Sequence, residues 1–224
     1  MNGKIKGILA VVCLVSAALA CRAVTGGGGD NNTPTPASKV ILSDDFSSEN
    51  WGTGTDSDSS VEYANNALQV IVYTTNYFIW STPNDQDYQD VHLEVTVTSN
   101  GTDSTTAFGL MCDQQTTNSN FYYLAMTPAG EYAIAKAVEG QTDLFLTNND
   151  QWATSDQIAK NASSYRVGAD CGKGTLTLYV DGQQIASVSD STYTSGGIGV
   201  FTWSGEEAST TNVSFDDFLV TALP

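Results

Sequence analysis

The chain has 224 residues, of which 25 are Asp or Glu and only 8 are Lys or Arg, so its formal net charge at pH 7 is −17. A field of this sign excludes nucleic acid and anionic lipid headgroups as favourable partners. The length suits one all-β domain or two small domains.

The N-terminus has the pattern of an export signal. Lys4 and Lys6 precede an apolar run over residues 8–20, which is shorter than the roughly 20 residues that cross a bilayer core and typical of a signal peptide. The run ends in Ala18-Leu19-Ala20-Cys21. This tetrapeptide resembles a bacterial lipobox, although Ala18 stands where Leu is usual. We therefore predict a signal peptide over 1–20 that ends in a lipobox. The alternative is ordinary signal-peptide cleavage after the same Ala-Leu-Ala, without lipidation.

The lipobox resemblance implies that Cys21 is lipidated and becomes the mature N-terminus. Residues 22–38 read RAVTGGGGDNNTPTPAS and show no apolar periodicity. Gly-rich sequence is flexible and Thr-Pro repeats favour extended polyproline geometry, so residues 21–38 are predicted to be a tether. These features together predict an exported protein, anchored by lipid at the cell surface or the outer face of a membrane, that carries a domain at 39–224.

Residues 39–224 show short alternating runs that are separated by turn residues. In residues 90–98 apolar and polar side chains alternate, and residues 68–72 and 176–180 repeat the pattern. Alternation of this kind is typical of strands with one face in a core. Asp181-Gly182 lies between two such runs, which predicts a hairpin with a type I′ turn. A second turn is predicted at 128–130, and the class is all-β.

Two cysteines remain for the mature domain. Cys13 is lost with the signal and Cys21 is assigned to lipid, which leaves Cys112 and Cys171 near the ends of predicted strands. A disulfide is the default for such a pair in an exported protein. Two free thiols or a metal pair are the alternatives, and His92 is the only His available to a metal.

The segments FYYLAMTPAGEYAIAK, YRVGADCGKGTLTLYVDGQQIASV and VSFDDFLV resemble bacterial concanavalin A-like domains, including laminin-G-like and sugar-binding relatives. The resemblance covers about residues 41–222. It implies a two-sheet antiparallel jelly-roll sandwich. It does not imply one function, because the same fold hosts lectins, glycosidases, proteoglycan-binding modules and spacers.

Catalytic signatures are absent from the sequence. The laminarinase-type enzymes of this fold carry Glu-x-Asp-x-x-Glu on one strand, and none of the seven Glu residues has that arrangement. Asp90, His92 and Glu94 are predicted to share one strand face, where His92 could act as a general base. The alternative is the solvated face of an amphipathic strand. The sequence therefore favours a domain without catalysis.

Aromatic residues point to carbohydrate binding. Residues 77–80 and 121–124 are apolar on both faces, so one face of each is predicted to present aromatic rings outside the core. Sugar rings stack on such side chains while polar neighbours pair with hydroxyls, and the concave sheet of a jelly roll is the expected place. The alternative is that most rings belong to the core. The candidate ligand contacts are Trp80, Tyr122, Lys136, Trp152, Trp203 and His92.

Acidic pairs lie near both ends of the domain, at Asp44-Asp45 and Asp216-Asp217. Terminal strands are neighbours in this kind of fold, so the pairs could converge on a structural Ca2+, which takes six to eight oxygen ligands. The alternative is that these side chains cap turns or bulges. No cofactor is required by any other feature.

The sequence thus predicts a surface-anchored, non-catalytic module that binds a glycan or polysaccharide. The rival hypotheses are a glycoside hydrolase or sugar-modifying enzyme of the same fold, and a structural or adhesion module that binds protein. No nucleic acid partner is expected, and membrane contact is expected through the lipid anchor only.

Overall fold

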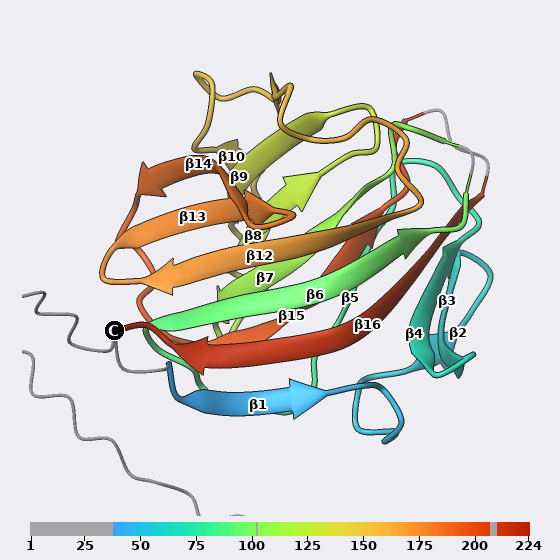
Figure 1. Cartoon of the computed structure of the whole chain (residues 1–224), viewed down its shortest axis with the longest axis horizontal. Coiled ribbons are helices and arrows are strands. Elements are labelled where there is room, and N and C mark those ends of the chain that lie inside the picture. The colour runs from blue at the N-terminus through green and yellow to red at the C-terminus, as the bar shows by residue number, and fades with distance from the viewer. Residues whose placement is uncertain (1–37, 102, 207–209) are drawn as a thin grey trace, which may run out of the picture. The chain divides into compact units, whose positions relative to one another are not determined.

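A computed structural model describes residues 38–101, 103–206 and 210–224 (Figure 1). The predicted signal peptide, Cys21 and nearly all of the tether lie outside these described residues. The described chain is all-β: it forms strands and turns and contains no helix. Accordingly, no helix within it is long and apolar enough to cross a membrane.

Two antiparallel sheets lie face to face (Figure 1). The first sheet, here sheet A, has the order β14-β13-β12-β6-β16-β4-β3-β2, with β1 paired to β16. Its strands are β1 (Val40–Asp44), β2 (Gly54–Thr55), β3 (Ser59–Ala64), β4 (Ala67–Val72), β6 (Val91–Ser99), β12 (Ser164–Gly172), β13 (Thr175–Val180), β14 (Gln183–Ser189) and β16 (Thr211–Ala222).

The second sheet, here sheet B, has the order β10-β9-β8-β7-β15-β5, with β11 paired to β9. Its strands are β5 (Phe78–Ser81), β7 (Ala107–Gln114), β8 (Phe121–Met126), β9 (Glu131–Ala137), β10 (Leu144–Phe145), β11 (Ala153–Thr154) and β15 (Gly197–Trp203). The two sheets confirm the predicted antiparallel jelly-roll sandwich.

The strand and turn predictions are confirmed where alternation was clearest. The strand expected over 90–98 is β6, whose residues alternate between buried and half-buried. The predicted hairpin is β13–β14, with positive φ at Asp181 (50°) and Gly182 (76°) as a type I′ turn requires. The turn predicted at 128–130 joins β8 to β9, and Gly130 takes a φ of 92° there. The first and last strands are neighbours, since β1 pairs with β16.

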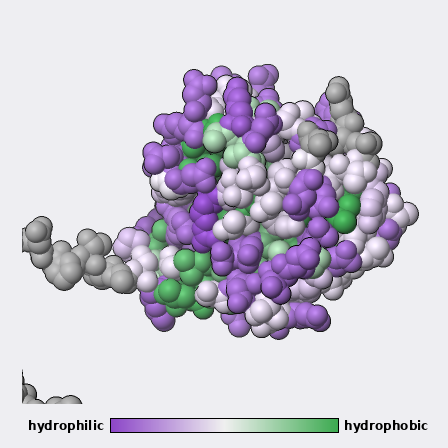
Figure 2. All heavy atoms as spheres, turned by 45° about the vertical axis from the view of Figure 1, so that its right-hand side comes forward, coloured by the Kyte–Doolittle hydropathy of each residue, from purple (hydrophilic) through white to green (hydrophobic). Residues whose placement is uncertain are grey.

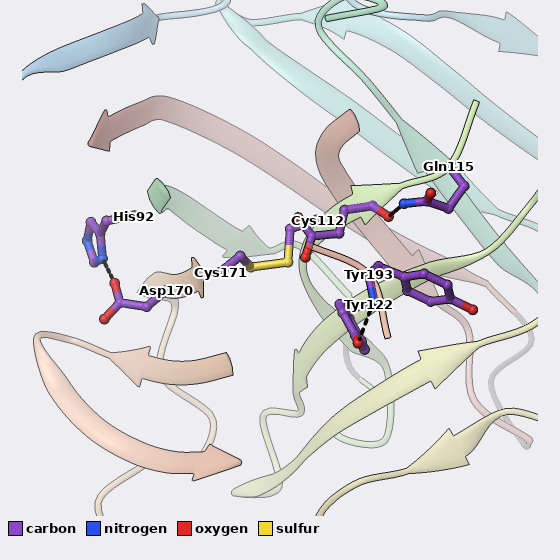
Figure 3. The surroundings of a disulfide bond; sticks show 8 residues. His92, Cys112, Gln115, Tyr122, Asp170, Cys171 and Tyr193 are labelled. Carbon is purple, nitrogen blue, oxygen red and sulfur yellow. Dashed lines mark hydrogen bonds and ion pairs between the residues drawn. A yellow bond between two sulfur atoms is a disulfide. The ribbon is translucent and has the colours of Figure 1, made fainter. Parts of the chain in front are cut away.

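Large apolar side chains fill the core between the sheets, and one disulfide bond crosses it. Leu93 on β6 and Leu124 on β8 are both fully buried in it. Cys112 on β7 is bonded to Cys171 on β12, which confirms the predicted disulfide and joins sheet B to sheet A (Figure 3). The two cysteines are 59 residues apart, so the chain-entropy model assigns this link about 4 kcal/mol of stabilisation.

The face of the molecule seen in Figure 2 is largely polar. In the view of Figure 2, apolar residues form small separate patches among hydrophilic ones. Among the exposed large apolar side chains are Tyr73, Trp80 and Leu144. Small scattered patches are normal for a soluble domain, so a binding face has to be recognised by its shape and chemistry rather than by area alone.

Candidate ligand-binding site

The outer face of sheet B carries a second apolar cluster, separate from the core. In β8, Tyr122 and Leu124 point into the core, so Phe121, Tyr123 and Ala125 must point to the opposite face. The outer cluster is made of Met111, Phe121, Tyr123, Ala125, Ala135, Ala137 and Phe201, with Phe78, Phe145 and Trp152 packed against it. Sheet B is therefore apolar on both faces, as residues 121–124 predicted.

Small residues shape this face into a hollow. A Cβ atom at Gly109 would overlap the carbonyl oxygen of Leu124, so a side chain there would push β7 and β8 apart. The same added atom would approach a ring carbon of Phe201 to 3.2 Å. The Phe201 ring therefore lies close to Gly109, and Phe78 stacks on Phe201 with centroids 4.8 Å apart and planes at 11°.

A pocket of about 310 Å³ opens above these rings. Its wall includes Trp152 and Trp203, whose rings are stacked with centroids 6.4 Å apart and planes at 21°. Its lining consists of Asn76, Phe78, Ala107, Tyr123, Ala125, Asp143, Phe145, Trp152, Phe201 and Trp203. The structure thus brings together two of the residues predicted from the sequence, Trp152 and Trp203.

Two hydrogen bonds fix polar groups at the pocket. The Tyr123 hydroxyl donates to Asp143 Oδ2 at 2.9 Å, and Trp203 Nε1 donates to Asn76 Oδ1 at 3.2 Å. Burial, followed by the charge of Asp143, raises the pKa of Tyr123, so its hydroxyl remains a proton donor. An aromatic cavity with a carboxylate and an amide at its edge offers both stacking surfaces and hydrogen-bond partners.

Trp80 lies beside this pocket and not in its lining. Its side chain is 39% exposed, and its ring centroid is 6.1 Å from that of Phe78 and 5.9 Å from that of Phe121. It also lines a neighbouring hollow of about 410 Å³ together with residues of β2 and β5. Trp80 is therefore an exposed ring on the same outer face, next to the Trp152–Trp203 pocket.

Tyr122 and Lys136 face the interior side of sheet B, away from the pocket. Tyr122 is fully buried and its hydroxyl donates to Asp190. Lys136 Nζ lies 2.9 Å from Asp190 Oδ2 and 2.9 Å from Thr192 Oγ1. Figure 3 shows Tyr122 beside Tyr193, whose backbone N–H donates to the Tyr122 hydroxyl at 3.1 Å. These contacts tie the segment after β14 to β8 and β9.

His92 lies on the outer face of sheet A, so it is on the other sheet from the pocket. Its Nδ1 is 2.6 Å from Asp170 Oδ1 (Figure 3), and its Nε2 is 3.3 Å from Glu94 Oε1. The hydrogen bond with Asp170 is the largest cause that raises the pKa of His92. Glu94 is also paired with Arg166 at 3.0 Å. Both ring nitrogens of His92 therefore have carboxylate partners within sheet A.

The acidic pairs near the chain ends bond to neighbouring backbone and indole groups. Asp44 accepts from the Phe46 N–H at 2.8 Å and from Trp51 Nε1 at 3.0 Å. Asp216 accepts from the Asp217 N–H at 2.7 Å, and Asp217 has a φ of 50° where the β16–β6 register shifts. Asp45 accepts from the Ser47 N–H at 3.0 Å. Within the described residues, no group of three or more His, Cys, Asp or Glu side chains could hold a metal ion.

The floor and the polar edge of the pocket were not predicted from the sequence. Phe78, Tyr123 and Phe201 were not singled out, nor were Asn76 and Asp143. For β8 a signal did exist: the large aliphatic Leu124 shares the parity of Tyr122, whereas the small Ala125 shares that of Tyr123. Cores favour the larger side chains, so Tyr123 is the ring expected on the outer face.

Comparisons with known proteins identify the fold. No protein-family model matches the chain, and none of the curated proteins does. The carbohydrate binding module CBM66 from Bacillus subtilis superposes with a TM-score of 0.60 at 14% identity, covering 77% of this chain and 96% of the module. A Bacillus subtilis protein of unknown function with a galectin-like fold gives 0.60 at 12% identity, with 82% and 96% covered. The beta-glucanase of Bacillus licheniformis gives 0.57 at 13% identity, with 82% and 98% covered.

Proposed function

Since the described domain is a jelly-roll sandwich with an aromatic pocket on sheet B, we propose that it binds carbohydrate through this face without chemical turnover. The observation that carries the proposal is the pocket between the Trp152–Trp203 stack and the Phe78 and Phe201 rings, with Asp143 and Asn76 at its edge. The apolar face of a sugar ring stacks on such rings, and its hydroxyls pair with the carboxylate and the amide.

The size of the pocket fits a short stretch of glycan. A volume of about 310 Å³ lies at the lower end of small-molecule sites. Trp80, exposed beside the pocket, supplies a further stacking surface on the same face. A carbohydrate-binding module is among the solved structures with this fold, which agrees with the proposal.

Hydrolysis is the second candidate function, because a beta-glucanase also shares the fold. Glycosidases require two carboxyl groups, about 5 Å apart in retaining enzymes and further apart in inverting ones. Asp143 is the one carboxylate in the lining of this pocket, where it accepts the Tyr123 hydroxyl, and Glu131 and Glu206 line an adjoining hollow instead. Binding without turnover is therefore the function that the geometry supports best.

The test is binding of the full chain, with Cys21→Ala to prevent lipidation, to an array of polysaccharides and glycans in the presence of Ca2+. We expect selective binding that Trp152→Ala and Trp203→Ala each weaken at least tenfold, as loss of a stacking residue commonly costs 1–3 kcal/mol. Trp80→Ala should weaken longer ligands more than short ones. The matched control is Tyr73→Ala, because Tyr73 is a similarly exposed ring next to β4 of sheet A.

Three results would contradict the proposal in different ways. A blank array would favour the protein-binding or spacer role. Release of reducing ends from a bound glycan by the wild type would favour the hydrolase. Equal losses from Tyr73→Ala and Trp203→Ala would show that binding does not use the pocket.

We also propose that the domain is held at the cell surface through lipid on Cys21, with residues 22–38 as the tether. Stable anchoring needs two or more acyl chains, which bacterial lipoprotein processing supplies. Cys21→Ala should move the protein from the membrane fraction to the soluble fraction. A protein that stays in the soluble fraction with Cys21 intact would contradict the anchor.

A further inference from the structure

A second pocket of about 410 Å³ shares Trp152 and Trp203 with the first. Its lining is acidic and hydroxylic, and consists of Thr105, Thr127, Glu131, Trp152, Trp203 and Glu206. Trp152 and Trp203 therefore belong to two adjoining hollows, one floored by aromatic rings and one bordered by two glutamates. Asp143 adds a third carboxylate in the first hollow.

Strand alternation sets the direction of Glu131. It is the first residue of β9, and it shares parity with Ala135 and Ala137 of the outer cluster. Its backbone is fixed by Thr127, whose Oγ1 accepts the Glu131 N–H at 3.2 Å and whose N–H donates to the Glu131 carbonyl at 2.9 Å. The carboxylate thus stands on the outer face of sheet B at a well-anchored strand start.

Glu206 stands on an anchored turn after β15. The Gly205 carbonyl accepts the Asn76 N–H at 2.6 Å, and the buried Ser204 accepts the Tyr77 N–H at 3.0 Å. Gly205 takes a φ of 78°, which a side chain would disfavour. The turn places Glu206 three residues after Trp203, at the same end of sheet B as Glu131.

Neither glutamate has a cationic partner in the described part of the chain. The ion pairs found there join His92 to Asp170 and Glu94, Arg166 to Glu94, and Lys136 to Asp190. Among residues 38–101, 103–206 and 210–224, no Lys, Arg or His lines either of the two pockets. With 25 acidic against 8 basic residues, the whole chain adds to the negative potential at this place.

We propose that these two adjoining pockets select glycans that carry protonated amines, of the glucosamine type, over neutral and anionic glycans. The inference rests on the proposed function and names the chemical class of its ligand. The ammonium group pairs with Glu131 and Glu206 while the sugar ring stacks on Trp203 or Trp152. An indole face also attracts a cation within about 6 Å of its centroid. Sulfated or uronate polymers meet like charges in the lining of both pockets, where the charged side chains are Asp143, Glu131 and Glu206.

The experiment compares two β-1,4-linked hexamers that differ at one group, glucosamine and N-acetylglucosamine, with the full chain carrying Cys21→Ala. Binding is measured by calorimetry at mildly acidic pH, where the amine is protonated. We expect the amine form to bind about tenfold more tightly, which is what two partly exposed charge contacts supply. Glu131→Gln with Glu206→Gln should reduce that preference to twofold or less.

The matched control is Glu49→Gln with Glu62→Gln, which changes the net charge equally at two exposed carboxylates outside both pockets. This control should keep the tenfold preference. Equal binding of the two hexamers, or a preference that survives in the Glu131/Glu206 variant, would overturn the inference and leave glycan binding intact. Equally tight binding of pentalysine would overturn it as well, because the amine would then be recognised without a sugar. Binding of neither hexamer nor any glycan of the array would overturn the proposed function itself.

Discussion

Asp113 is a buried carboxyl whose ionisation should cost the folded domain stability. It is 5% exposed, and it lies in β7 directly after the disulfide residue Cys112. Burial is the main cause that raises its pKa from 3.8 to about 6, and the negative charge of Asp90 adds to the shift. Asp113 also has a φ of 52°, a left-handed conformation that Asn tolerates as well as Asp does. Asp113→Asn therefore removes the charge and keeps the backbone geometry.

The size of the effect follows from the pKa difference between the two states. A folded-state pKa above the unfolded value means that the folded protein binds the proton more tightly, so stability is full below about pH 4 and falls as pH rises through 6. Two pKa units correspond to about 3 kcal/mol. We expect Asp113→Asn to match the wild type near pH 4 and to be more stable by about 2–3 kcal/mol at pH 7.5.

The assay is urea unfolding followed by Trp fluorescence at several pH values between 4 and 7.5, with the disulfide oxidised. Other carboxylates change stability in the opposite direction: Glu94, for example, is partly buried, but hydrogen bonds from Arg166 and His92 lower its pKa. The difference between the free energies of unfolding of wild type and Asp113→Asn at each pH is free of those contributions, because both proteins share them. Asp90→Asn is the control, and it should keep most of the pH dependence because burial is the larger cause. A constant difference between wild type and Asp113→Asn across this range would refute the reasoning.

Three further stability predictions concern buried polar groups. Thr202 is fully buried and its hydroxyl has no partner among the described residues, so Thr202→Val should raise the free energy of unfolding by about 1 kcal/mol. Thr211→Val, which breaks the 3.1 Å hydrogen bond to Thr106, should lower the free energy of unfolding by a similar amount. If Thr202→Val unfolds at a lower urea concentration than the wild type, the expectation for Thr202 is wrong. Lys136→Met leaves the carboxylate of Asp190 without its cation in a site where both side chains are about 15% exposed, so the loss in urea unfolding should be about 2 kcal/mol.

Strand alternation predicted the sandwich because it reports directly on which residues share a face. It worked best for β6 and the β13–β14 hairpin, where one face is polar. It was ambiguous for β8, since Phe121, Tyr122, Tyr123 and Leu124 are apolar on both faces. There the sequence predicted rings outside the core, but it could not by alternation alone decide between Tyr122 and Tyr123.

Contacts that join distant strands were out of reach of the sequence. The sequence placed His92 on one strand face with Asp90 and Glu94, yet its shortest contact is to Asp170, 78 residues away and directly opposite on β12. Asp90 instead takes a φ of 52° just before β6 and accepts the Lys173 N–H. Asp143 likewise reaches the pocket from a loop next to β10. Register between strands decides such contacts, and a local pattern does not encode it.

The two outer faces of the sandwich differ in how far their polar groups are already satisfied. On sheet A, His92, Glu94, Arg166 and Asp170 neutralise one another within one network. On sheet B, Glu131 and Glu206 border a hollow next to stacked Trp rings, and no Lys, Arg or His among the described residues lines it. An unpaired charge costs little while water surrounds it. When a ligand covers the carboxylates and removes that water, a cation on the ligand can supply the missing partner. This difference is the physical reason to expect the ligand on sheet B. The paired charges of sheet A are expected to stabilise the fold instead.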